Sequence, residues 1–137
     1  MPFEITEQIQ RHLDDDRTVL LTTVTPTNRP APRPVWFLWD GSKFVVFSRP
    51  NTAKLRHIAV NPNVALGNGI GARGGADTIV ISGTAQIVPD APSAAEIPAY
   101  VERYDSLITR LGMDPEKFAA TYSVPIHIAP SKAWAIP

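Results

Sequence analysis

The sequence predicts a mainly β protein, a six-stranded antiparallel β-barrel with helices between some of the strands. The strand signal is strongest in residues 18–25 and 78–88, because β-branched residues dominate both runs. Glycine, proline and asparagine separate these and the other apolar runs, as they do in turns. A chain of 137 residues suits one compact domain, so we expect residues 1–137 to form a single barrel.

The N-terminal segment is predicted to be an amphipathic helix over residues 4–13. Ile5, Ile9 and Leu13 recur at i, i+4 and i+8, which gives the helix one apolar side. Residues 14–16 are three aspartates, and we interpret them as a solvated loop without a function. The first strand follows at residue 18.

An antiparallel meander is predicted over the first three strands. Residues 26–30 form the first turn, and Arg33–Trp39 is the second strand. This strand shows no clean alternation, so we expect both of its faces to be covered. One face would fill the barrel, and the other would meet a helix, a ligand or a second subunit. Asp40 and Gly41 then form a hairpin turn into residues 43–48.

Residues 44–66 contain a strand, a turn, a short helix and a further strand. Leu55, Ile58 and Ala59 give the helix an apolar face, Asn51 or Thr52 can cap it, and Asn61-Pro62 ends it. The cations Arg49, Lys54 and Arg56 lie near the helix start, where unpaired amides and the helix dipole favour a phosphate. The alternative is that these are solvated charges beside an amphipathic helix.

Gly69, Gly71 and Gly74 have the spacing of a dinucleotide-binding turn, but the segment that follows them is a strand and not a helix. We therefore predict a flexible hairpin loop at residues 67–75. Gly83 lies inside the next strand and indicates a bulge or a close approach of another backbone.

The C-terminal part is predicted to contain two helices and a last strand. The first helix runs to Leu111, with Gly112 ending it, and the second opens at Asp114-Pro115 and reaches about residue 122. One side of the first helix carries Val101, Tyr104, Ile108 and Leu111. The last strand covers residues 124–129, with a further extended piece at 133–136.

Composition excludes several function classes. The 13 basic and 13 acidic residues balance, which disfavours a nucleic-acid-binding domain, and the absence of cysteine excludes thiolate catalysis and disulfides. The three histidines are scattered, so we predict no metal site. No motif for a serine nucleophile or a nucleotide loop is present. A polar start and no long apolar run lead us to expect a cytoplasmic protein without membrane contact.

The chain resembles the pyridoxamine phosphate oxidase-like split β-barrel superfamily, over nearly its whole length. The resemblance is carried by TVLLTTVTPTNRPAPRPVWFLWDGSKFVVFSRPNTAKLRHIAVNPNVAL and by IVISGTAQIV. Within that superfamily it most resembles the small actinobacterial enzymes that use the deazaflavin coenzyme F-420. The resemblance implies an FMN-binding-like barrel and a homodimer, with the cofactor in a groove between subunits.

The resemblance also implies a cofactor site. Lys54 and Arg56 match the phosphate ligands of the family, although a regular helix separates them by about 200°. Both therefore reach one phosphate only if the helix starts after Lys54; otherwise Arg56 faces elsewhere, such as toward the acidic tail of F-420. Ser48, Arg49, Asn51 and Thr52 match the strand end and turn beside the cofactor, and Pro34, Val35 and Trp36 match the wall along its ring. Packing in the core or between subunits is an equal alternative for Trp36.

The resemblance implies an F-420-dependent oxidoreductase. The reduced cofactor would supply a hydride to an enone, quinone or similar conjugated small molecule, and no side chain has to be a nucleophile. The sequence identifies no catalytic residue. The alternatives are an FMN-dependent oxidoreductase or oxidase on the same barrel, and a protein that binds F-420 without turnover.

Overall fold

The structure is a computed structural model that describes residues 3–69 and 77–136. Helices and strands follow one another in the predicted order. The elements are α1 (Glu7–Asp15), β1 (Thr18–Val24), β2 (Pro30–Trp36), β3 (Leu38–Trp39), β4 (Phe44–Ser48), α2 (Ala53–Val60), β5 (Asn63–Gly67), β6 (Thr78–Ile87), the 3-10 turn η1 (Ala94–Glu96), α3 (Pro98–Arg110), α4 (Pro115–Thr121) and β7 (Val124–Ile136).

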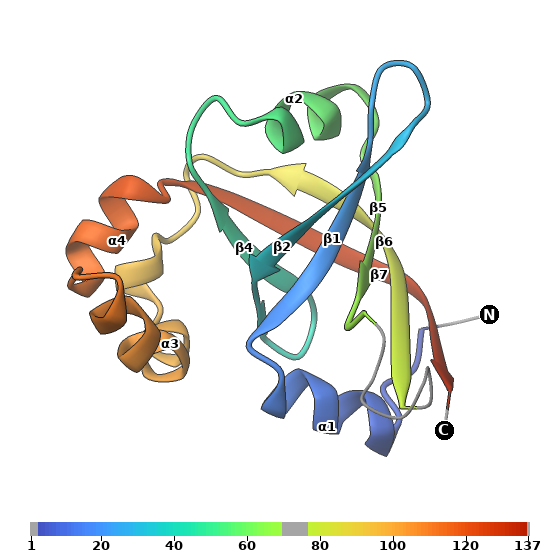
Figure 1. Cartoon of the computed structure of the whole chain (residues 1–137), viewed down its shortest axis with the longest axis horizontal. Coiled ribbons are helices and arrows are strands. Elements are labelled where there is room, and N and C mark those ends of the chain that lie inside the picture. The colour runs from blue at the N-terminus through green and yellow to red at the C-terminus, as the bar shows by residue number, and fades with distance from the viewer. Residues whose placement is uncertain (1–2, 70–76, 137) are drawn as a thin grey trace.

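The strands of the described residues form one seven-stranded antiparallel sheet in the order β2-β1-β5-β6-β7-β4-β3. The sheet curls into a half-barrel (Figure 1), and its two edge strands, β2 and β3, are joined in the chain through Phe37 alone. The predicted mainly β barrel is confirmed. The strand number differs from six because the run 33–39 divides at Phe37 and pairs with a different neighbour on each side.

This division changes two expectations. β2 pairs with β1 and β3 pairs with β4, so the meander is interrupted at Phe37. Arg33 and Pro34 are exposed in the single chain, whereas all five residues of β4 are buried. β4 is therefore the strand with both faces covered, because the barrel interior lies on one side of it and the C-terminal helices lie on the other.

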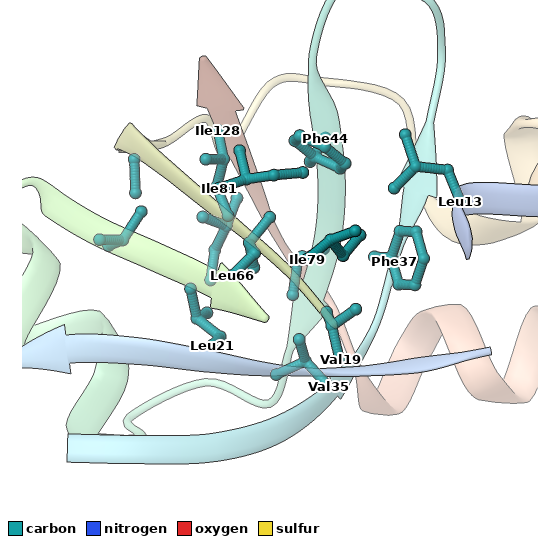
Figure 2. Close-up of a cluster of buried hydrophobic side chains, with 14 of the residues drawn as sticks. Leu13, Val19, Leu21, Val35, Phe37, Phe44, Leu66, Ile79, Ile81 and Ile128 are labelled. Atoms are coloured by element: carbon teal, nitrogen blue, oxygen red, sulfur yellow. The ribbon is translucent and has the colours of Figure 1, made fainter. Parts of the chain in front are cut away.

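The main core fills the curled sheet. Figure 2 shows Val19 and Leu21 of β1, Leu66 of β5, and Ile79 and Ile81 of β6 pointing toward one another. α1 and α2 lie at opposite ends of the sheet in Figure 1. Each helix adds its apolar side to this core, α1 through Ile9 and Leu13 and α2 through Ile58. The two short helices thus close the ends of the half-barrel.

A second core lies between β4 and the α3–α4 pair. It buries Val45 and Phe47 of β4 against Tyr100 and Tyr104 of α3 and Phe118 of α4. α3 ends at Arg110, and the next residues leave the helix through Gly112, whose φ is +74°. The sequence predicted Leu111 on the same side of the helix as Tyr104 and Ile108. That prediction is wrong, because Leu111 lies beyond the end of α3 and is 51% exposed.

The N-terminal helix differs from the prediction at both ends. It begins at Glu7, because Thr6 caps it by accepting a hydrogen bond from the Ile9 amide at 3.3 Å. It continues to Asp15, so Asp14 and Asp15 are helical and not part of a loop.

The register of β6 shifts at Gly83, which confirms the predicted bulge. A Cβ at this glycine would lie 2.6 Å from the Ala129 carbonyl oxygen of β7, so the two backbones approach closely here. The two predicted extended pieces at 124–129 and 133–136 are one strand, β7. Most of the predicted glycine-rich loop, residues 70–76, lies outside the described residues, but β5 and β6 on either side of it pair antiparallel, as expected for a hairpin.

Candidate functional site

A cavity of about 450 Å³ lies where the start of α2 faces the α3–α4 pair across β2 and β4. One end of the cavity is cationic and the other is aromatic. Its lining consists of Thr18, Pro34, Val35, Trp36, Phe47, Arg49, Thr52, Lys54, Tyr100, Leu111, Phe118 and Tyr122. Within the described part of the chain, no carboxylate and no histidine lines it.

The turn from β4 into α2 shapes the cationic end. The buried Ser48 hydroxyl donates to the Arg49 carbonyl at 2.8 Å and lies 2.9 Å from the Thr52 hydroxyl, which donates to it because the Ser48 proton is already used. Asn51 takes a left-handed conformation with φ of +63°. Thr52 precedes the helix, but its side chain makes no capping bond. The first amides of α2 therefore have no side-chain cap at this end of the cavity.

Lys54 lies in the first turn of α2 and is half-buried. Burial lowers the pKa of its ammonium group, and the nearby charge of Arg33 lowers it further. Both effects disfavour the protonated form when no anion is present. A bound anion would reverse this balance, so the residues at this end suit an anionic group.

The other end is a set of stacked rings. The Trp36 ring lies 4.7 Å from Tyr104 and 5.3 Å from Phe118, nearly parallel to both. Phe118 stacks in turn on Tyr122 at 4.6 Å, and the Arg49 guanidinium lies 5.0 Å from the centre of the Tyr122 ring. A flat apolar molecule can lie against these rings, with its charged part toward α2.

The structure brings six of the nine predicted site residues to this cavity. These are Pro34, Val35, Trp36, Arg49, Thr52 and Lys54. Trp36 packs within its own chain and also lines the cavity, so its two interpretations are compatible.

The other three predicted residues lie around the turn. Ser48 holds the turn from inside, and the Arg56 guanidinium donates to the Asn51 carbonyl at 2.9 Å. Because α2 begins at Ala53, before Lys54, the condition for Arg56 and Lys54 to share one phosphate is not met. Whether any of the nine residues touches a cofactor stays a prediction.

The sequence reasoning missed the helical side of the cavity. Tyr100 and Leu111 come from α3, and Phe118 and Tyr122 come from α4 and the residue after it. Phe118 and Tyr122 are four residues apart, which places them on one side of a helix and is the signal that was available. Burial raises the pKa of Tyr100, so its hydroxyl stays protonated.

Comparison with known proteins identifies the family of the chain. The family model described as pyridoxamine 5′-phosphate oxidase matches residues 5–134. The chain belongs to this family. That result confirms the resemblance found in the sequence and the fold that it implied. None of the curated proteins matches the chain.

Several solved structures are similar to this member of the pyridoxamine 5′-phosphate oxidase family. A structure named as an F-420 reductase shares 26% identity at a TM-score of 0.71, covering 91% of this chain and 94% of that one. The putative pyridoxamine 5′-phosphate oxidase from Listeria innocua shares 24% identity at 0.66, covering 96% and 98%. The heme storage protein HutZ from Vibrio cholerae shares 15% identity at 0.65, covering 98% and 96%. The last two show the fold alone.

Helices long and apolar enough to cross a membrane do not occur among residues 3–69 and 77–136. The same residues hold no cluster of three or more acidic or histidine side chains that suits a metal ion.

Proposed function

We propose that this chain is an oxidoreductase that uses coenzyme F-420 and reduces a conjugated small molecule such as an enone or a quinone. The observation that carries the proposal is the two-ended cavity, with the uncapped start of α2 and Lys54 at one end and stacked rings at the other. A deazaflavin has this same division between a phosphate and a flat ring system. The likeness to a structure named as an F-420 reductase supports the choice of cofactor.

The residues of the chain have separate tasks in this proposal. Lys54 and the first amides of α2 hold the phosphate, and Arg49 lines the same cavity with its guanidinium over the Tyr122 ring. Pro34, Val35 and Trp36 form the wall along the ring. Ser48, Asn51 and Thr52 fix the turn, and Arg56 braces it through the Asn51 carbonyl.

The reduced deazaflavin supplies a hydride when it is bound. The chain contributes position and an apolar environment, because the cavity lining among the described residues contains no carboxylate or histidine to act as a base. Tyr100 and Tyr122 are the hydroxyl-bearing rings near the aromatic end, and no proton transfer is assigned to either.

We also propose that the protein is a cytoplasmic homodimer, without nucleic-acid or membrane partners. Pro34 and Thr18 line the cavity and are exposed in the single chain, so the cavity is open on the side of β1 and β2. A second subunit on that side would turn the cavity into a groove between subunits.

The experiment is a titration of the purified protein with F-420 and, separately, with FMN, followed by quenching of its three tryptophans. Tight binding of F-420 with weak binding of FMN supports the proposal. The reverse preference moves the protein to FMN chemistry on the same barrel, and binding of neither contradicts the proposal. Reduced F-420 is then mixed with a panel of enones and quinones, where binding without turnover indicates a storage or carrier protein.

Matched variants locate the site. Lys54→Ala should weaken F-420 binding at least about tenfold, because a charge-assisted bond to the phosphate is lost. Lys117→Ala removes an exposed cation from α4 and should leave affinity unchanged. Equal affinities of the two variants would remove Lys54 from the site.

A further inference from the structure

Two buried hydroxyl groups of the sheet hold the two ends of α2. Apart from tyrosines, the buried polar side chains among the described residues are Thr23 of β1 and Ser48 of β4, each 1% exposed. The Thr23 hydroxyl lies 2.9 Å from Nδ1 of His57, and the Ser48 hydroxyl lies 2.9 Å from the Thr52 hydroxyl. Thr52 directly precedes α2, and His57 lies in its second half. Both buried hydroxyls therefore bond to the same short helix.

Thr23 occupies an inward position of its strand. Burial alternates along β1, and Val19 and Leu21 are the other inward residues. A buried hydroxyl is unfavourable unless it is hydrogen-bonded, and the His57 imidazole supplies that bond. Either group can be the donor, because a hydroxyl both donates and accepts. The pair thus puts a directional contact at a position where an apolar side chain would only fill space.

Apolar packing alone holds α2 weakly. Ile58 is the buried residue among the eight of this helix, and Leu55 is partly buried against the same core. A helix this short is unstable by itself, and contacts between apolar groups are non-directional. α2 lies against β1 and β6 (Figure 1), so a hydrogen bond to β1 can fix its rotation about its own axis.

The rotation of α2 decides where Lys54 points. Lys54 and His57 are three residues apart, so they lie on neighbouring parts of the helix surface. His57 bonds to β1, while Lys54 lines the 450 Å³ cavity. On a helix roughly 11 Å wide with its side chains, a rotation of about 30° displaces the side-chain ends by about 3 Å. This displacement is as long as a hydrogen bond, so it would separate the Lys54 ammonium from a bound anion.

We infer that Thr23 and His57 are positioning residues, which fix the rotation of α2 so that Lys54 faces the cavity. Within the described part of the chain, neither side chain lines that cavity, so both act through Lys54 and not by contact with the ligand. The inference rests on the proposed function for the identity of the ligand. The position of Lys54 can be measured without any ligand.

A double-mutant cycle separates positioning from stability. Thr23→Val should weaken F-420 binding about fivefold in the natural protein, because the Lys54 ammonium is displaced from the phosphate. In a Lys54→Ala protein the same change should alter affinity by less than about twofold, since no ammonium is left to displace. The fall in melting temperature should be equal in the two backgrounds. A fivefold loss of affinity in both backgrounds would overturn the inference.

Conservative and neighbouring variants show whether the hydroxyl is responsible. Thr23→Ser keeps the hydroxyl and should bind F-420 within about twofold of the natural protein. Thr22→Val removes a hydroxyl from the outer side of the same strand and should leave affinity unchanged. If Thr23→Ser binds as weakly as Thr23→Val, the hydrogen bond to His57 does not position Lys54.

Removing both partners tests the same point at nearly constant stability. Replacing both groups of a buried hydrogen bond by apolar groups of similar shape is close to neutral for folding. Thr23→Val combined with His57→Leu should therefore melt within about 4 °C of the natural protein and still bind F-420 about fivefold more weakly. Full affinity in this double variant would contradict the positioning role.

A measurement on the free protein makes the inference independent of the cofactor. Burial and the Arg33 charge lower the pKa of Lys54 below its ordinary 10.5. In Thr23→Val the helix is free to turn the ammonium toward solvent, where a charge is favoured, so this pKa should rise toward 10.5 in an NMR titration of the Lys54 side chain. An unchanged titration would overturn the inference. If the natural protein binds no F-420, the cofactor proposal fails and this titration alone decides whether Thr23 and His57 position Lys54.

Discussion

The Tyr104 hydroxyl accepts a hydrogen bond from the backbone amide of Phe37 at 2.8 Å. It also lies 2.7 Å from the carbonyl oxygens of Phe37 and Arg17 and donates to one of them. Arg103, the neighbour of Tyr104 on α3, donates to the Phe37 carbonyl at 3.1 Å. Phe37 is the residue between β2 and β3, where the chain passes from one sheet edge to the other. Side chains of α3 thus make the hydrogen bonds to the Phe37 backbone that a neighbouring strand makes to residues within the sheet.

Tyr104→Phe should destabilise the protein by about 1–3 kcal/mol. The substitution keeps the buried ring and leaves the Phe37 amide buried without a partner. Urea unfolding measures the effect. Tyr100→Phe is the matched control on the same helix, since the structure records no hydrogen bond from that hydroxyl within its described part, and it should change stability by less than about 0.5 kcal/mol. Equal losses in both variants would contradict the role given to Tyr104.

Affinity for F-420 should fall as the pH rises from about 7 toward about 10. Burial and the charge of Arg33 lower the pKa of Lys54 below its ordinary 10.5, so in the free protein the ammonium loses its proton earlier than an exposed lysine does. The neutral amine no longer attracts the phosphate. Lys54→Arg is the control, because a guanidinium stays charged over this range and should flatten the profile. An unchanged profile in that variant would show that another group titrates.

The pH dependence of stability should contain a contribution from His12. Burial lowers the pKa of this imidazole, but its contacts with Asp77 at 3.0 Å and Asp16 at 2.8 Å outweigh burial and raise the pKa above 6.5. Since the folded pKa is raised, the stabilisation is complete below pH 6.5 and is lost as the pH rises through the raised value.

Melting temperatures across this interval measure the His12 contribution. The natural protein should lose stability toward alkaline pH, and His12→Gln should lose less over the same range. His127→Gln is the comparison, because burial and the Lys43 charge lower the pKa of His127 and its contribution therefore lies at more acidic pH. A parallel decline in the natural protein and in His12→Gln would contradict the assignment.

Gly83→Ala should cost about 1–3 kcal/mol of unfolding free energy. The new Cβ would lie 2.6 Å from a β7 backbone oxygen, which no side-chain rotation can relieve. Thr84→Ala changes the exposed neighbour on the same strand and should cost well under about 1 kcal/mol. Chemical denaturation separates the two, and a Gly83→Ala protein as stable as the natural one would mean that β6 and β7 can move apart at the bulge.

Local signals in the sequence were sufficient for much of this fold. β1 and α2 follow from β-branched residues and from the apolar spacing around Ile58, and the Gly83 bulge follows from a glycine inside a strand. The break at Phe37 could not be predicted, because Tyr104 and Arg103 satisfy its backbone from α3, far along the chain.

The candidate site shows the same division between local and distant contacts. Lys54 and Thr52 lie on the turn that the sequence identified, and the structure places both at the cavity. The aromatic end depends on Phe118, which stacks on Trp36, and on Tyr122, whose ring contacts the Arg49 guanidinium. Each of these contacts joins residues that lie about 70 positions apart or more in the chain. Spacing within one segment carries no information on such a contact. The role of Arg56 depended on whether α2 starts before or after Lys54, and the structure starts it at Ala53. The sequence could not decide this point, because the exact ends of helices are poorly defined by sequence.

The prolines of β2 protect the protein from aggregation. Pro30, Pro32 and Pro34 occupy alternate positions of an edge strand, so the backbone nitrogens of one side of that strand carry no hydrogen. An incoming strand would find no donors at three successive positions along this edge and could not extend the sheet. The proline pattern thus keeps this edge of the half-barrel from adding strands of other molecules, which is how fibrils grow.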